Sequence, residues 1–267
     1  MVINVEAKVA EIAYEFPWSM RIFDRLGIDY LCCNATQSLR KAALGAGIDE
    51  AALRDTILVT SPGSEPDRDW SGIRPAEIVD HILAKHHEFT RSEIARLDPL
   101  VDRLVRLYGD RQPELLVVQR LFGQIRDELL PHMQREEMLL FPLIRALDRG
   151  LFDASMGPAR AVRVPIQSMC REHEGAVRLF GELRCVTALY SISEDGCLLF
   201  RAVMQGLADL EQDVLEHTYL EDDILFPAVM KLQQATMAVA EDSSSAIRGS
   251  KRASVSSERP AFVARFS

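Results

Sequence analysis

Hydrophobic residues along most of the chain recur at the three- and four-residue spacing of an amphipathic helix, not at the alternating spacing of a β-strand. From Pro75 onward, this pattern predicts long helices over residues 75–108, 113–147, 160–190 and 197–233. Turn-forming residues separate the helices at 109–113, 150–158 and 191–196. We therefore predict an all-α fold whose main part is a four-helix bundle.

The pattern changes on either side of a polar segment. Residues 1–60 form short helical stretches broken at Pro17, Gly27 and residues 45–47, which predicts a small helical domain. Residues 61–74 contain proline, glycine and charged residues, as linkers do, and the predicted bundle domain follows over residues 75–234. The last predicted segment, 235–267, is rich in serine and poor in large apolar residues, so we expect a disordered tail.

Composition narrows the class of protein. Of the 267 residues, 48% are hydrophobic and 27% are charged, which is typical of a globular chain. A formal net charge of −9 disfavours nucleic acid and anionic membranes as main partners, because both repel an acidic protein. No segment approaches the roughly 20 apolar residues of a membrane span, and residues 1–16 lack the pattern of a secretory signal. We therefore expect a cytoplasmic protein.

The bundle sequence contains an internal repeat. The segment HMQREEMLLFPLI begins at His132, and HTYLEDDILFPAV begins at His217. Both contain His, Glu four residues later, a further acid, and then Leu-Phe-Pro in the same register. One helix before each copy stands another His followed by Glu, at His87 and His173. The predicted bundle therefore consists of two related helical hairpins.

The spacing within the repeat predicts metal binding. Residues i and i+4 lie on the same helix face, about 5–6 Å apart at Cβ, so His and Glu can reach one ion. Hydrophobic residues flank both copies at helical spacing, so we expect the His and Glu side chains of the repeat to be buried. These flanking residues are Ile125, Leu129, Leu139, Leu140, Val214 and Leu225. Burial without partners would cost several kcal/mol. The predicted metal ligands are His87, His132, Glu136, His173, His217 and Glu221.

Two ions explain six ligands better than one, with Glu136 and Glu221 as bridges. Imidazole and carboxylate groups together suit iron, manganese, zinc or copper, and the lack of a nearby cysteine disfavours a closed structural zinc site. A single copy of the motif is more typical of a surface ion pair or a hydrogen-bonded core histidine. Two copies in register and two further histidines favour a metal centre over a purely structural bundle.

Three other side chains lie near the predicted ligands in the sequence. His81 and His86 are rotated away from His87 around the helix, so we interpret them as residues of the polar face or as supports behind the ligands. Tyr108 lies on the same stripe as His87, but about 32 Å farther along a straight helix. We therefore predict that Tyr108 is a packing residue.

The chain has five cysteines, an odd number that favours reduced thiols over a disulfide framework. Cys170, Cys185 and Cys197 stand alone in helical patterns and are predicted to be small buried apolar residues. Cys32 and Cys33 are adjacent and cannot easily pair with each other. They are either free thiols available for exchange, metal or a second chain, or incidental buried residues.

These motifs in combination resemble a known family. The segment LGIDYLCCNATQSLRKAALGAGID, residues 26–49, resembles a short domain with an Asp-[Tyr/Phe]-Cys-Cys-Gly-Gly motif. The six His and Glu residues, PIQSMCREHE, and the Leu-Phe-Pro after each Glu resemble the hemerythrin-like domain of the repair-of-iron-centres di-iron proteins. The resemblance covers residues 5–233. Leu31 is an additional residue before the cysteines, and Asn34 and Ala35 replace the two glycines, so the turn around the thiols must differ.

The resemblance implies a small helical domain followed by a hemerythrin-like four-helix bundle. It implies two non-haem iron ions, bridged by oxo and carboxylate groups, with the four histidines as terminal ligands. Cys32 and Cys33 would take part in catalysis through iron delivery, redox exchange or dimerisation, which leaves a homodimer open. The implied function is the repair of iron-sulfur clusters damaged by nitric oxide or oxidative stress, by supplying iron to the damaged proteins. Alternatives are a sensor module that binds O₂ or NO, and a di-iron enzyme that reduces NO.

Overall fold

Helices make up most of the part of the chain that the structure describes. The computed structural model describes residues 3–16, 18–30, 36–59, 69–151, 162–192, 197–236 and 238. Within these ranges there is no β-strand, and one isolated bridge pairs Lys8 with Ser38. None of the described helices is both long enough and apolar enough to cross a membrane. The predicted all-α fold is confirmed.

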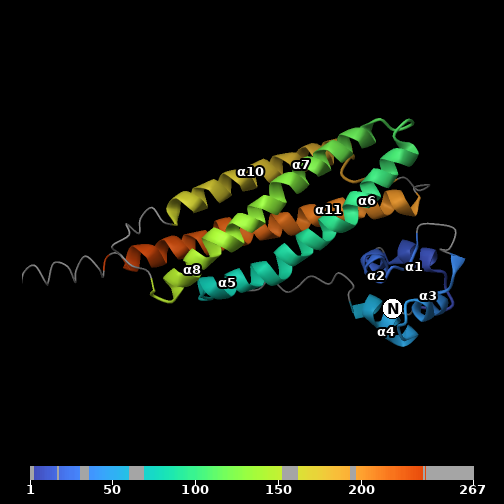
Figure 1. Cartoon of the computed structure of the whole chain (residues 1–267), viewed down its shortest axis with the longest axis horizontal. Helices are drawn as coiled ribbons and strands as arrows, with labels where there is room; N and C mark the ends of the chain where they lie inside the picture. Colours follow the sequence, from blue (N-terminus) through green and yellow to red (C-terminus); the bar gives the residue numbers. More distant parts are fainter. Residues whose placement is uncertain are drawn as a thin grey trace, which may run out of the picture.

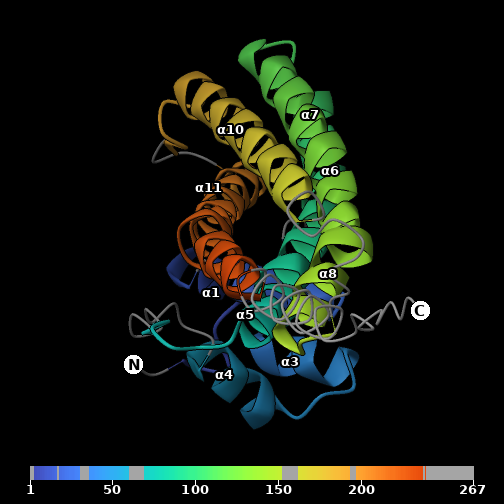
Figure 2. The same ribbon diagram turned by 90° about the vertical axis from the view of Figure 1, so that its left-hand side faces the viewer.

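Four long helical runs form an up-down-up-down bundle (Figure 1). The first comprises α5 (Pro75–His81), the π-helical turn η2 (Ile82–His87) and α6 (Glu88–Tyr108). The second comprises α7 (Glu114–Arg135), the π-helical turn η3 (Glu136–Leu140) and α8 (Phe141–Asp148). The third is α10 (Arg163–Val186), and the fourth comprises α11 (Leu198–Tyr219), the π-helical turn η5 (Leu220–Leu225) and helix as far as residue 236. Seen along the bundle, the four runs surround a common centre (Figure 2).

Local sequence explains where several of these helices begin and end. Pro75 occupies the first turn of α5, where the missing N–H of proline costs no helical hydrogen bond. Gly150 follows α8 with a φ of +67°, a left-handed conformation that favours glycine. The third helix was predicted to reach residue 190 but ends at Val186, because Ala188, Leu189 and Tyr190 all have positive φ. Helical spacing did not predict this end to the residue, since none of these three residues signals a left-handed turn.

The three π-helical turns change the register of the bundle helices. Proline follows two of them, at Pro142 and Pro227, where the ring clashes with the carbonyl four residues earlier and favours a wider turn. The sequence predicted Leu139 on the buried stripe of His132, but its side chain is 60% exposed. Leu140, one residue later, is 1% exposed. The extra residue in the π-helical turn therefore moves the core position from Leu139 to Leu140, and the prediction for Leu139 was wrong.

The buried apolar residues of the bundle form two clusters. One joins α6, α7, the second half of α10 and most of α11, and includes Leu97, Phe122 and Leu207. The other joins α5, α8, the first half of α10 and the end of the fourth run, and includes Phe141 and Val229. In each helical run, the predicted metal ligands lie between residues of the two clusters. Close-packed apolar side chains therefore enclose the ligands from both ends of the bundle.

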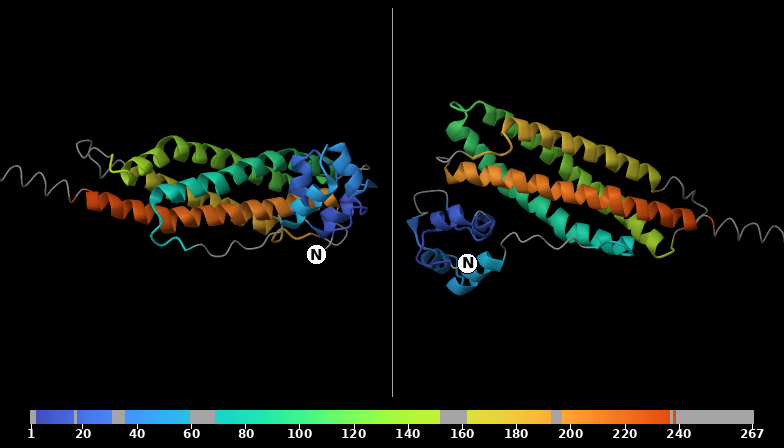
Figure 3. Two further views of the ribbon diagram at one scale, coloured as in Figure 1. Left: turned by 90° about the horizontal axis from the view of Figure 1, so that it is seen from below. Right: turned by 180° about the vertical axis from the view of Figure 1, so that it is seen from behind.

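The N-terminal helices have their own core at one end of the bundle (Figure 3). They are α1 (Val9–Glu15), α2 (Ser19–Arg25), α3 (Leu39–Gly45) and α4 (Glu50–Val59). Ala202 of α11 joins their apolar cluster, so they pack directly against the bundle. Cys32 and Cys33 lie outside the described residues. So does the predicted disordered tail, apart from residues 235, 236 and 238.

Candidate metal centre

The structure brings all six predicted ligands together in the middle of the bundle. Each of the four helical runs contributes at least one of them. The six side chains are buried, and both glutamates are 0% exposed. Their donor atoms form two groups, within which all atoms lie within 4.8 Å of one another: His87, Glu136, His217 and Glu221, and His132, Glu136, His173 and Glu221.

Each glutamate turns one oxygen to each pair of histidines. The Glu136 Oε2 atom lies 3.3 Å from His87 Nε2, and its Oε1 lies 3.1 Å from His132 Nε2. Glu221 repeats this arrangement, since its Oε1 lies 3.3 Å from His217 Nε2 and its Oε2 lies 3.1 Å from His173 Nε2. The result is two sets of two nitrogens and two oxygens that share both carboxylates. We call the two sets of imidazoles the His87–His217 pair and the His132–His173 pair.

The donor spacing fits metal ions. Donors held at ~2.1 Å from one ion lie roughly 3–4 Å from each other, which agrees with the nitrogen–oxygen distances in both sets. Two carboxylates that each offer one oxygen to each set have the arrangement of bridging ligands. The geometry therefore accommodates two ions.

The hydrogen bonding also fits a metal centre. Both oxygens of Glu136, both oxygens of Glu221, His87 Nε2 and His217 Nε2 are buried without a hydrogen-bond partner. Polar atoms in such a place normally have partners, because each one left alone costs about 1–3 kcal/mol. Several such atoms converging at one point call for a cation as their common partner.

Three of the imidazoles are oriented by an acid on their other nitrogen. The contacts to Nδ1 are His87 to Glu137 at 2.7 Å, His132 to Glu172 at 2.8 Å, and His173 to Asp222 at 3.0 Å. A carboxylate on Nδ1 places the ring proton there and leaves Nε2 as an acceptor or metal donor. His132 Nε2 and His173 Nε2 lie 3.1 Å apart, so either a proton or a metal ion must separate the two ring nitrogens.

Further side chains hold these three acids. Arg91 contacts Glu137 at 2.7 Å, and Arg135 contacts Glu172 at 2.5 Å. The Cys170 thiol donates to Asp222 at 3.2 Å. The roles of the three acids were not predicted, although the sequence contains a signal: both copies of the repeat place an acid directly after the ligand glutamate, and Glu172 directly precedes His173.

The charges of the centre favour cations. Burial opposes the charged form of His173, but the hydrogen bond to Asp222 and the negative charge of Glu221 outweigh it and raise the pKa of the imidazole to about 10. Burial also opposes ionisation of Glu221, but the positive charges of His217 and His173 lower the pKa of this carboxyl. A protein without metal would therefore hold protons here, and metal binding must displace them.

The structure decides between the alternatives for the neighbouring residues. His86 is buried, hydrogen-bonded through Nδ1 to Asp213 at 2.9 Å and stacked on His217, so it belongs behind the ligands and not on a polar face. Tyr108 contacts the bundle core and donates to Cys197 at 3.4 Å, in agreement with its predicted packing role.

The prediction of buried lone cysteines was wrong at two positions and inaccurate at the third. Cys185 and Cys197 are exposed, and Cys170 is partly buried. Cys185 lies near the end of α10, and Cys197 is the residue directly before α11, where the helix ends expose them to solvent. A cysteine in a helical pattern marks no face of the helix, so its burial could not be read from spacing alone.

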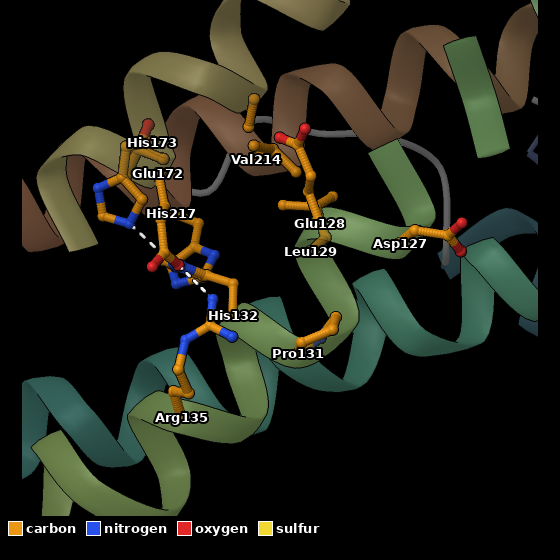
Figure 4. Close-up of a pocket in the computed structure, with 12 residues that line it drawn as sticks. Asp127, Glu128, Leu129, Pro131, His132, Arg135, Glu172, His173, Val214 and His217 are labelled. Carbon is orange, nitrogen blue, oxygen red and sulfur yellow. Dashed lines mark hydrogen bonds and ion pairs between the residues drawn. The ribbon is translucent and has the colours of Figure 1, made fainter. Parts of the chain in front are cut away.

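A cavity of about 340 Å³ reaches the centre from one side. His132, His173 and His217 contribute to its wall and lie together in Figure 4, while Asp127 lies apart from them. Glu172 and Arg135 also line the cavity. A small molecule can therefore approach the side of the centre formed by these three imidazoles.

Comparisons with known proteins agree with the fold and with cation binding. Residues 79–229 match the family described as the hemerythrin HHE cation binding domain, and residues 5–59 match a domain of unknown function called DUF542. The chain is 28% identical over 222 residues to the iron-sulfur cluster repair protein YtfE of Enterobacter sp. (strain 638), covering 83% of this chain and 96% of the relative.

Two further relatives have similar names and coverage. One is a probable iron-sulfur cluster repair protein of Haemophilus influenzae, 29% identical over 84% of this chain and 97% of the relative. The other is the iron-sulfur cluster repair protein ScdA of Staphylococcus haemolyticus, 30% identical over 84% of this chain and 98% of the relative. The chain therefore belongs to the hemerythrin HHE family, among the members that carry a DUF542 domain before the helical bundle.

Proposed function

We propose that this protein holds two iron ions between its four helical runs and supplies iron to iron-sulfur proteins whose clusters have been damaged. One observation carries the proposal: two carboxylates with no hydrogen-bond partner each turn one oxygen to two separate pairs of imidazoles. Nitrogen and oxygen donors in this combination suit iron. The names of the relatives, which cover nearly their full length, support cluster repair as the purpose of the iron.

The proposed ligands are the six residues of the two donor sets. His87, His132, His173 and His217 would each donate Nε2 to one ion, and Glu136 and Glu221 would bridge. Bound iron would supply Lewis-acid and one-electron redox chemistry. The surrounding residues orient the imidazoles and exclude bulk water, since the two apolar clusters enclose the site from both ends.

Supply of iron requires release as well as binding. Release is favoured by ligands that can take up protons in place of metal, and the raised pKa values of His132, His173 and His217 give these imidazoles that property. The cavity beside these three residues offers a path between the centre and the surface. The partners would be damaged iron-sulfur proteins, encountered in the cytoplasm under nitrosative or oxidative stress.

A second candidate function uses the same cavity. Its position beside three proposed ligands favours access by O₂ or NO, so a sensor that binds these gases, or an enzyme that reduces NO, is the alternative. The N-terminal thiols Cys32 and Cys33 remain predicted participants in delivery, redox exchange or dimerisation.

The test is transfer of labelled iron. Protein loaded with ⁵⁷Fe is mixed anaerobically with a ferredoxin-type acceptor whose cluster has been damaged by NO, with sulfide and thiol present. We expect the cluster absorbance to return and ⁵⁷Fe to appear in the cluster by Mössbauer spectroscopy. The Glu136→Leu variant, treated in the same way, should transfer little iron. Recovery no faster than with free iron at the same concentration would contradict the proposal.

The same samples separate the alternatives. Gas binding is followed by stopped-flow absorption, and NO reduction by the amount of N₂O formed with a reductant. Reversible binding of O₂ or NO without loss of iron supports the sensor. Formation of N₂O in multiple turnovers supports the enzyme.

A further inference from the structure

The internal repeat includes the acids that contact the ligand imidazoles through Nδ1, as well as the ligands themselves. Glu137 directly follows Glu136, and Asp222 directly follows Glu221. Their contacts correspond too, because Glu137 accepts from Nδ1 of His87 and Asp222 from Nδ1 of His173. Each hairpin thus supplies an acid that orients the imidazole of its own first helix.

The other two imidazoles should be supported across the hairpins, but only one is. Glu172 directly precedes His173 and reaches across to Nδ1 of His132 at 2.8 Å. The corresponding residue, directly before His87, is His86. Its ring stacks on His217 with 5.6 Å between centroids and an interplanar angle of 11°. An imidazole ring therefore stands where the repeat places a carboxylate.

No acid replaces this missing support in the described part of the chain. Glu221 is the one acid there within ion-pair distance of His217, and it faces Nε2, the metal side of the ring. The His86 ring is itself anchored away from His217, since its Nδ1 contacts Asp213, which Thr90 also contacts at 3.3 Å. His86 Nε2 is buried without a partner, so this ring supplies no anionic support.

The two donor sets are therefore unequal. In the His132–His173 pair, both imidazoles have a carboxylate on Nδ1. In the His87–His217 pair, only His87 has one. Such a carboxylate raises the basicity of the ligand nitrogen and fixes the ring, and its loss typically lowers metal affinity by about 10- to 100-fold.

We propose that the His87–His217 pair holds its ion more weakly than the His132–His173 pair and is the position from which the first iron is given up. His86 acts as a positioning residue that keeps this half of the centre labile. The inference rests on the proposed function, because it names which of the two bound ions would be delivered.

The experiment measures iron release from the fully loaded protein to an excess of a chromogenic Fe(II) chelator, under anaerobic reducing conditions. We expect two phases of equal amplitude, each one ion per chain, with rate constants that differ by about 10-fold or more. A single phase that releases both ions would overturn the proposal.

Two matched variants assign each release phase to one of the two donor sets. The Glu137→Gln variant removes the support of His87 and should accelerate only the fast phase. The Glu172→Gln variant removes the support of His132 and should accelerate only the slow phase, bringing the two rates together. If both variants accelerate the same phase, the assignment is wrong. Circular dichroism of the metal-free variants checks that both fold.

Adding a carboxylate behind His217 tests the proposal more strictly than removing one elsewhere. The double variant His86→Glu, Asp213→Asn places a carboxylate where the repeat expects one and removes the acid that would repel it. The fast phase should slow by about 10-fold. The control His86→Gln, Asp213→Asn, which adds no charge, should leave it fast. Equal rates in the two double variants would contradict the role of His86.

A spectroscopic readout separates positioning from a general loss of stability. The Mössbauer component that remains after the fast phase in the wild type should be altered in the fully loaded Glu172→Gln variant and unaltered in fully loaded Glu137→Gln. Failure of cluster repair with release still in two phases would reject the proposed function alone. Successful repair with single-phase release would reject this inference alone.

Discussion

Each imidazole of the centre owes its orientation to the group behind it. An acid stands behind His87, His132 and His173, and a second ring stands behind His217. These contacts fix which ring nitrogen faces inward, so the arrangement of four Nε2 atoms exists before any metal binds. The contribution of these contacts to the free energy of unfolding can be measured in the metal-free protein, where they are ion pairs.

The pair of Glu172 and His132 gives a pH prediction. Burial opposes ionisation of Glu172, but hydrogen bonds from His132 and Arg135 lower the pKa of its carboxyl from 4.5. Burial likewise opposes the charge on His132, but Glu136 and Glu172 raise the pKa of this imidazole from 6.5. The carboxyl contributes stability above its unfolded pKa and loses it as pH falls through the folded value. The imidazole contributes stability below its unfolded pKa and loses it as pH rises through the folded value.

The contribution of the pair is therefore complete between about pH 4.5 and 6.5. We expect the free energy of unfolding of metal-free wild type to exceed that of Glu172→Gln most strongly in this window. The difference should shrink on either side, as measured by urea denaturation at about pH 3, 5.5 and 9. A difference that grows steadily down to pH 3 would contradict the assignment of this ion pair.

At the scale of helices, close approach between α6 and α11 depends on a missing side chain. A Cβ atom at Gly206 would overlap Arg96 Nη2 and would lie 2.7 Å from both Glu93 Oε1 and Leu97 Cδ2. Glu93 and Leu97 are buried, so they have little room to move. Glycine at this position lets the two helices approach closely.

We predict that Gly206→Ala lowers the free energy of unfolding by about 1–3 kcal/mol, because the methyl group forces the buried side chains apart. Gly123 of α7 is the matched control, since a Cβ atom there meets nothing within 4 Å. The Gly123→Ala change should stabilise the protein by up to about 1 kcal/mol through helix propensity. Urea denaturation of both variants measures the contrast, and equal effects would show that α6 and α11 do not depend on Gly206.

The helices also show which positions can be predicted from helical spacing and which cannot. The repeat identified the six side chains that meet in the structure, because the i and i+4 rule survives across one turn of helix. It failed beyond Glu136, where Leu139 turns outward because η3 contains an extra residue per turn. The acids behind the imidazoles lie on other helices, so their contacts depend on how the helices pack and could not follow from spacing. The thiols of Cys32 and Cys33 stay a prediction.

At the scale of the whole molecule, a network of buried and partly buried charges attaches the N-terminal helices to the bundle. Arg21 of α2 contacts Glu93 at 3.0 Å and Asp209 at 2.5 Å. Arg96 of α6 contacts Asp24 at 2.9 Å and Glu93 at 2.7 Å. Glu93 is 2% exposed, and it pairs with one arginine of α2 and one of α6. This network determines how the N-terminal helices sit beside α6 and α11.

We predict that Arg96→Met weakens this attachment by about 3 kcal/mol, because it removes the arginine that pairs with Asp24 and leaves Glu93 with one partner fewer. Hydrogen exchange should accelerate in α2 and remain unchanged in α10. Adding Glu93→Leu should recover part of the loss, since it removes the buried charge that Arg96 neutralised. Uniform acceleration across both helices would instead mean that Arg96 stabilises the whole chain and not the attachment.

The proposal of a two-metal centre rests on two shared carboxylates and four imidazoles. Its most direct test is the metal content of anaerobically purified and iron-loaded protein, determined by mass spectrometry together with Mössbauer spectroscopy. We predict two iron ions per chain in the wild type and loss of both in Glu136→Leu and in Glu221→Leu, because each carboxylate serves both donor sets. A wild-type protein that binds no transition metal, or a Glu136→Leu variant that keeps both ions, would contradict the account.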